Sequence, residues 1–102
     1  MDILPEPLSF EWDKGNMPKN LYKHGVTYQE AEEMFSKDPL VLTRDQAHSR
    51  PGERRFGAFG KTKARRRLFA IFIIKGNKIR VISVRDMTRT EEDVYEDFER
   101  NS

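Results

Sequence analysis

The chain contains no cysteine, so it can build neither a disulfide framework nor a cysteine-based metal site. It also has no N-terminal apolar segment of signal-peptide length, and no apolar run long enough to span a bilayer. These absences are typical of a protein that works in a reducing cytoplasm. We therefore expect a cytoplasmic protein with no membrane partner.

Hydrophobic residues are few: they make up 36% of the 102 residues, and charged residues make up 35%. Seven Phe, three Tyr and one Trp nevertheless indicate a packed core rather than a disordered chain. A chain of this length is expected to form one domain. Residues 1–8 include two prolines and show no periodicity, so we expect a flexible arm at 1–8 and a single domain over 9–102.

The net charge is only +2, but charges of opposite sign are separated along the chain. Residues 1–43 carry a formal charge of −4, residues 44–89 a charge of +11, and residues 90–102 a charge of −5. A basic middle between acidic ends favours a surface that binds a polyanion or an acidic protein. The alternative is a solvated surface of mixed charge.

The apolar pattern predicts an α+β fold. Two capping boxes, Thr27 with Glu30 and Thr88 with Glu91, each predict the start of a helix. The expected strands are 9–12, 39–44, 54–62, 68–74 and 79–85, and the expected helices are 19–25, 28–37 and 89–100. Strands joined by hairpins indicate a small antiparallel sheet of about four to five strands, with two N-terminal helices and one C-terminal helix.

Two connections and one strand define that sheet further. Gly76 and Asn77 predict a two-residue hairpin, and residues 45–53 predict a loop. The run 68–74 is continuously apolar, so we expect a central strand buried on both faces.

The strand at 79–85 raises a question, because arginines interrupt an otherwise apolar sequence. A period of two places Arg80 on one face and Arg85, with Ser83, on the other. A guanidinium on a buried strand is costly unless it meets an anion or reaches water. Arg85 could pair with an acid of the last helix, such as Glu91 or Glu92. Alternatively, it could bind a phosphate, since guanidinium matches phosphate oxygens bidentately.

A set of short motifs runs through most of the chain and is specific as a set. It comprises FEWD at 10–13, N-x-x-KHG at 20–25, Glu30-Ala31, Phe35, Asp38-Pro39, D-x-x-HS at 45–49, E-x-R-F at 53–56, Gly60, R-x-I-S-x-R at 80–85, and Glu91 with Tyr95. Over about residues 10–96 this set resembles the BrnT ribonuclease toxins of type II toxin–antitoxin systems. One position departs from the pattern: Asn16 stands where the family usually has Lys.

The resemblance implies a fold similar to the RelE/ParE toxins and an endoribonuclease that cleaves RNA and halts translation. It also implies a cognate, BrnA-like antitoxin that neutralises the toxin and alone contacts operator DNA. The RNA substrate would be messenger RNA, on or off the ribosome. A non-catalytic module that binds nucleic acid or a partner protein, such as an inactive toxin, is the alternative.

Cleavage of RNA without a metal requires removal of the 2′-hydroxyl proton, stabilisation of the phosphorane and protonation of the leaving 5′-oxygen. Arg55 and Arg85 are the expected phosphate-binding groups, and Arg80 is a weaker candidate. His24 or Glu53 could be base or acid. The structural alternatives are a helix C-terminal role for His24 and an ion pair between Glu53 and Arg55.

Other basic residues are expected to bind the RNA backbone or, alternatively, acidic side chains of the antitoxin. Together with Ser83, they form the expected RNA-binding set: Lys23, Lys61, Lys63, Arg65 and Arg66. Asp45, His48 and Glu53 lie close in sequence and could hold a divalent metal, but their spacing matches no specific motif. We therefore expect no metal and no cofactor.

Overall fold

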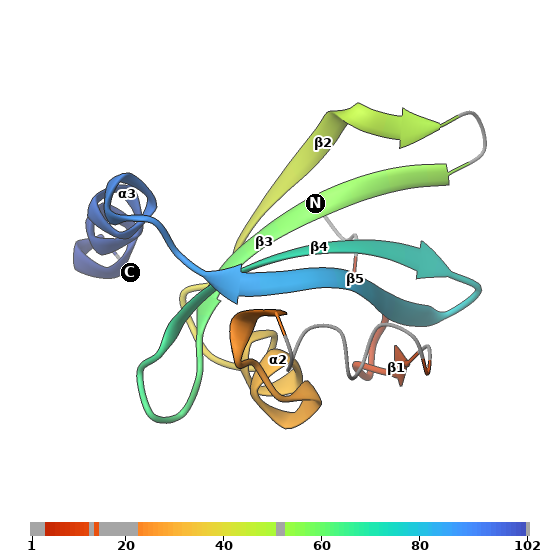
Figure 1. Ribbon diagram of the computed structural model, residues 1–102, viewed down its shortest axis with the longest axis horizontal. Helices are drawn as coiled ribbons and strands as arrows, with labels where there is room; N and C mark the ends of the chain where they lie inside the picture. The colour runs from red at the N-terminus through yellow and green to blue at the C-terminus, as the bar shows by residue number, and fades with distance from the viewer. Residues whose placement is uncertain (1–3, 13, 15–22, 51–52, 102) are drawn as a thin grey trace.

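The computed structural model describes residues 4–12, 14, 23–50 and 53–101, without the side chains of residues 45–50. One five-stranded sheet in the order β1-β5-β4-β3-β2 runs through the molecule, and two helices flank it within this described part (Figure 1). The elements are β1 (Phe10–Glu11), α2 (Tyr28–Met34), β2 (Val41–Arg50), β3 (Glu53–Lys61), β4 (Arg67–Lys75), β5 (Lys78–Asp86) and α3 (Arg89–Arg100).

The sheet is mixed rather than antiparallel, which corrects the sequence-based expectation. Strands β2 to β5 follow one another as antiparallel neighbours, whereas β1 pairs with β5 in parallel. The backbone N–H of Ile79 donates to the carbonyl of Ser9 at 2.8 Å and supports this edge. No hairpin joins β1 to its neighbour, because α2 and three strands intervene in the sequence. Its direction is therefore not restricted to antiparallel.

Local sequence signals for the helix starts and for one hairpin are confirmed. Both capping boxes are present, with Thr27 and Thr88 as the N-caps of α2 and α3. The β4–β5 hairpin turns at Gly76-Asn77, where Gly76 adopts a positive φ of 62°. The expected helix at 19–25 falls mostly on residues outside the described ones.

Residues 45–50 form a strand, so the predicted loop at 45–53 is wrong over this segment. Strand β2 pairs with β3 from Val41 to Asp45 and again at Arg50, with an irregularity between the two pairings. This strand is at the edge of the sheet, where polar residues are tolerated because one side faces water. A polar edge strand and a loop therefore have similar compositions.

The two faces of the sheet differ. Helix α2 covers one face, where it buries an apolar core; its members are Val26, Ala31, Met34, Phe35, Phe56, Ala58, Leu68, Ala70, Phe72, Ile79, Val81 and Val84. Helix α3 lies beyond one end of the sheet (Figure 1). The other face, which we call the open face, leaves Phe69, Ile71 and Ile73 of β4 only partly buried. The prediction that β4 is buried on both faces is therefore wrong.

An irregularity in β5 changes which side chains share a face. Val81 pairs with Phe72, but Ser83, two residues on, pairs with Ile71, so Ile82 is an extra residue in the ladder. The extra residue shifts the alternation by one position. Arg80 therefore lies on the open face with Ser83 and Arg85, and not on the opposite face as simple period-two alternation predicts.

Candidate functional site

The register of the strands arranges the open face in rows. Phe59, Phe69 and Arg85 form one row across β3, β4 and β5, because Phe69 pairs with both of the others. Cross-strand neighbours of this kind project from the same face of a sheet. This row lies at the end of the face nearest α3.

The next two rows extend the open face away from α3. Gly57, Ile71 and Ser83 form the adjacent row. Ile73 pairs with Arg80 in the row beyond. Arg55 of β3 lies one residue beyond the last β3–β4 pair, on the same face. The three candidate arginines therefore surround a small centre formed by the row of Gly57, Ile71 and Ser83.

Gly57 contributes no side chain to this centre, and neighbouring side chains pack closely over it. A Cβ added at Gly57 would lie 2.6 Å from Oγ1 of Thr43 and 3.0 Å from Cε1 of Phe69. Thr43 and Phe69 thus pack directly against the glycine backbone. Any larger residue would displace them and fill the surface between the arginines.

Arg85 is held in place by a carboxylate and an aromatic ring. Its two terminal nitrogens donate to Glu91 of α3 at 2.8 and 3.1 Å, and its guanidinium lies 4.7 Å from the ring centroid of Phe69. The hydrogen bond with Glu91 raises the pKa of Arg85, which keeps its positive charge. The two terminal nitrogens of Arg85 that contact Glu91 have the geometry with which a guanidinium binds two phosphate oxygens.

Glu91 serves two functions at once. Besides Arg85, its carboxylate accepts a hydrogen bond from the backbone N–H of Thr88 at 2.8 Å, which completes the cap of α3. The hydrogen bond from Arg85, followed by those from Thr88, holds the pKa of Glu91 below its usual value. The expected pairing of Arg85 with an acid of the last helix is thus present, and it couples β5 to α3.

Arg55 and Glu53 lie at the far end of the open face. Nε of Arg55 is 3.5 Å from Oε1 of Glu53, and their side chains are 24% and 39% exposed. The ion pair considered as the structural alternative for Glu53 is therefore present. It places a carboxylate beside a guanidinium on a partly exposed surface.

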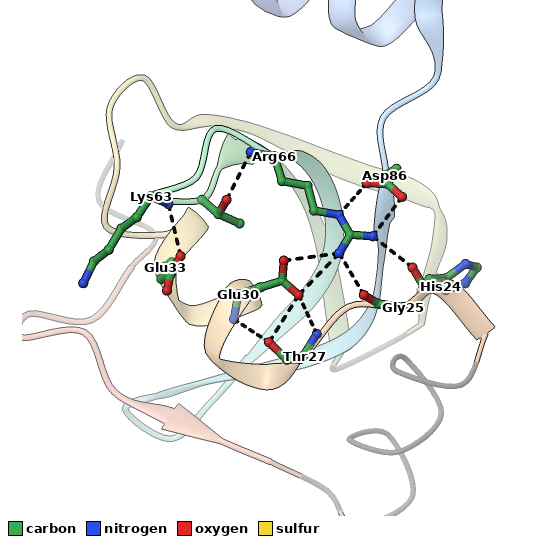
Figure 2. A network of polar contacts seen from close by, with 9 residues as sticks. His24, Gly25, Thr27, Glu30, Glu33, Lys63, Arg66 and Asp86 are labelled. Atoms are coloured by element: carbon green, nitrogen blue, oxygen red, sulfur yellow. Dashed lines mark hydrogen bonds and ion pairs between the residues drawn. The ribbon is translucent and has the colours of Figure 1, made fainter.

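Arg66 is the centre of a polar network on the other side of the molecule (Figure 2). Its guanidinium binds both carboxylate oxygens of Asp86, at 2.7 and 2.9 Å, and pairs with Glu30 at 3.2 Å. It also donates to the backbone carbonyls of His24 and Gly25, at 3.1 and 2.8 Å. These contacts join α2, the β3–β4 turn and the end of β5. Arg66 is therefore engaged in holding the fold.

His24 belongs to that network and not to the open face. Its carbonyl accepts from Arg66, and the charge of its imidazole contributes to the lowered pKa of Asp86, whose main cause is the hydrogen bond from Arg66. Asp86 pairs with Leu68 on the α2 side of the sheet, whereas Arg85 projects from the open face. The structure thus does not bring His24 together with Arg85.

Lys61 also has a structural partner. Its ammonium contacts Glu99 of α3 at 2.6 Å, and Arg67 contacts Glu96 and Glu99 at 2.9 and 2.7 Å. These ion pairs hold α3 against the ends of β3 and β4. Arg67 was not among the expected site residues, and the only sequence signal for it is its position directly before an apolar strand.

Three of the expected RNA-binding residues are exposed: Lys23, Lys63 and Arg65. The backbone N–H of Lys63 donates to Glu33 at 3.1 Å, while the side chain points away from the network in Figure 2. Arg65 adopts a positive φ of 67° in the β3–β4 turn, a conformation that is uncommon for a residue other than glycine.

The family model described as the ribonuclease toxin BrnT of type II toxin–antitoxin systems matches residues 12–91. The chain belongs to this family. A BrnT crystal structure, that of the Brucella abortus ribonuclease toxin, is 22% identical, with a TM-score of 0.60 over 80% of this chain and 99% of that one. This likeness shows that the two proteins share a fold. No curated protein sequence matches the chain.

All the candidate site residues of this BrnT protein fall inside the matched segment, whereas α3 beyond Glu91 falls outside it. Among the described side chains, no group of three or more His, Asp or Glu residues could hold a metal ion. The side chains of Asp45 and His48 lie outside this set. Among the residues that the structure describes, none of the helices could span a membrane.

Proposed function

We propose that this BrnT protein is a metal-independent endoribonuclease that cleaves RNA on its open face and thereby inhibits translation. The observation that carries this proposal is the gathering of Arg80, Ser83 and Arg85 on one face, with Arg55 at its edge. Guanidinium groups bind phosphate through paired donors. Neither of the two described helices lies over the centre of this partly exposed face, which leaves room for an extended RNA strand.

The chemistry follows from the RNA itself, whose 2′-hydroxyl is the nucleophile. Arg85 and Arg80 would bind the non-bridging oxygens of the scissile phosphate and stabilise the charge that develops in the phosphorane. Arg55 would bind the same or a neighbouring phosphate. Ser83, between Arg80 and Arg85, would donate a hydrogen bond to the phosphate.

Glu53 is the better candidate for the general base. It lies on the open face next to Arg55, whereas His24 lies with Asp86 on the other side of the sheet. A carboxylate beside the phosphate-binding arginines could take the 2′-hydroxyl proton directly or through a water molecule. His24 remains a candidate only for an RNA strand that passes around the end of β5.

The basic residues outside the open face divide into two groups. Lys23, Lys63 and Arg65 are exposed and would contact backbone phosphates without base preference. Lys61 and Arg66 are engaged by acidic partners within the chain, so we assign them to stability rather than to RNA binding.

The partners follow from the family. We propose that a cognate, BrnA-like antitoxin neutralises the protein in the cytoplasm and supplies the contact with operator DNA. A short open reading frame for this antitoxin should lie beside the toxin gene. An isolated gene would count against the toxin assignment.

The test is cleavage of a labelled messenger RNA by the antitoxin-free protein in EDTA, with and without ribosomes. We expect cleavage by the parent and none by the Arg55→Ala/Arg85→Ala variant. Arg89→Ala is the matched control, because Arg89 is 88% exposed on α3 and its removal changes the charge without touching the open face. Cleavage by the double variant at the parent rate would refute the site.

A non-catalytic binder is the second candidate, and one observation favours it: Glu91 occupies the phosphate-binding fork of Arg85. A folded parent that binds RNA but cleaves none, with or without ribosomes, would support this alternative. Both candidate functions predict RNA binding, and only the endoribonuclease predicts RNA cleavage.

A further inference from the structure

An apolar groove separates α3 from the end of the sheet. It has a volume of about 250 Å³ and is lined by Val41, Thr43, Phe59, Thr90, Glu91, Val94, Tyr95 and Phe98. Val94 and Phe98 are 53% and 46% exposed, and they lie one helical turn apart. A cluster of exposed apolar side chains with polar surroundings marks a site of protein interaction.

Electrostatics disfavours RNA as the occupant of this groove. Helix α3 carries six acidic residues and two arginines. Asp93 and Asp97 precede Val94 and Phe98 by one residue each on α3; their side chains are 63% and 66% exposed, and each lies 3.5 Å from an arginine of the same helix. A polyanion would be repelled by the excess of acidic residues on this helix, whereas an amphipathic peptide with basic flanking residues would complement it.

We propose that this groove is the docking site of the antitoxin, which inserts the apolar side chains of an amphipathic segment and places basic residues against Asp93 and Asp97. The proposal rests on the assignment of the chain to a toxin–antitoxin family, and it adds the surface and the chemistry of the contact. The antitoxin would bind at the α3 end of the open face, where Phe59 lines the groove, and would leave the centre of that face uncovered.

The position of the groove provides a route from docking to inhibition. Glu91 lines the groove and also occupies the guanidinium fork of Arg85. A phosphate can reach that fork only when Glu91 releases it. A segment that fixes α3 against the sheet stabilises the arrangement in which Glu91 remains on Arg85, so it disfavours RNA binding.

The test compares the parent with the Val94→Ser/Phe98→Ser variant of the full-length protein. Both side chains are about half exposed, so their replacement leaves the fold intact, which circular dichroism verifies. Tyr28→Ser is the matched control, because Tyr28 is 41% exposed on α2, outside the groove. The probe is the purified antitoxin encoded beside the toxin gene, and the readouts are its Kd and the Kd for RNA.

We expect the double variant to bind the antitoxin at least tenfold more weakly than the parent, with an unchanged Kd for RNA, and Tyr28→Ser to behave as the parent. Parent-like antitoxin binding by the double variant would overturn the proposal. So would a loss of RNA binding, which would place RNA in the groove. A parent dimer that the double variant abolishes would assign the groove to a second copy of the chain.

This design separates the two proposals. Antitoxin binding is measured without reference to cleavage, so a parent that binds the antitoxin but cleaves no RNA refutes the endoribonuclease activity alone. A parent that cleaves RNA while the groove variant is still neutralised refutes the docking site alone.

Discussion

Replacement of Arg66 by alanine tests whether this arginine holds the fold or binds RNA. The guanidinium joins three segments that are distant in sequence, through carboxylates on α2 and β5 and two backbone carbonyls. In Arg66→Ala those acceptors lose their partner together. We therefore expect a large loss of stability and, under native conditions, a Kd for RNA within about twofold of the parent value.

The magnitude follows from the exposure of each contact. Asp86 is 58% exposed, so its pair with Arg66 is screened by water and contributes at most about 1 kcal/mol. Glu30 is 28% exposed and contributes about 1 kcal/mol. The two carbonyls add roughly another 1 kcal/mol after water replaces the guanidinium. The free energy of unfolding should thus fall by about 2–3 kcal/mol, or Tm by roughly 10–20 °C.

The pH dependence gives a further check on the same variant. The hydrogen bond from Arg66 lowers the pKa of Asp86, and the bonds from Thr27 and Arg66 outweigh burial to lower the pKa of Glu30. Carboxylates with a lowered pKa stabilise the fold above their unfolded pKa values, about 3.9 and 4.3, and lose this contribution as the pH falls through the folded values. The stability gap between parent and variant should therefore be constant near neutral pH and narrow below about pH 4 to the roughly 1 kcal/mol of the two carbonyl contacts, which do not titrate.

Urea unfolding followed by tryptophan fluorescence measures this gap, with Arg65→Ala as the control. Arg65 is exposed in the same turn, so its removal changes the charge equally. A loss below about 0.5 kcal/mol in Arg66→Ala, the range of ordinary surface substitutions, would refute the structural role. A tenfold weaker Kd for RNA in the folded variant would restore Arg66 to the RNA-binding surface.

Three further outcomes are expected. Gly57→Ala should lower the free energy of unfolding by about 1–3 kcal/mol, because its Cβ would meet Oγ1 of Thr43 at 2.6 Å; a neutral effect in urea unfolding would contradict the packing described. Tyr95→Phe should cost about 1 kcal/mol, because it removes a buried hydrogen bond. Burial raises the pKa of Tyr95 to about 12, so the higher stability of the parent relative to Tyr95→Phe should persist below about pH 10 and vanish as the pH rises through about 12. Measuring the free energy of unfolding of both proteins at increasing pH would show this loss. Glu91→Gln should tighten RNA binding several-fold, because the neutral amide competes less well for Arg85; weaker binding in a filter or polarisation assay would argue that Glu91 does not compete with phosphate.

The fold class and most elements were predictable because they depend on local signals. The two capping boxes and the Gly76-Asn77 turn encode their conformations within a few residues. The parallel pairing of β1 was not predictable in the same way, since it depends on contacts with residues about seventy positions away. The sequence did not predict residues 45–50 of β2 as a strand, because polar edge strands and loops have similar amino-acid compositions.

The candidate site was predictable in its residue types but not in its arrangement. The alternation of β5 fails at Ile82, where an extra residue moves Arg80 to the open face, and no local signal marks this irregularity. The acidic partners of Lys61 and Arg66 could not be predicted from the sequence for a similar reason. Their acids come from α3, α2 and the end of β5, so only the folded chain shows that these cations are engaged.

The central claim is that RNA is cleaved on the open face, and Arg80 tests it most directly because only the irregularity in β5 places it there. The measurement is the rate of RNA cleavage in EDTA by Arg80→Ala and by Arg89→Ala, which removes an arginine from α3 instead. We expect Arg80→Ala to lose at least tenfold in rate while Arg89→Ala matches the parent. Equal rates for all three proteins would contradict the account.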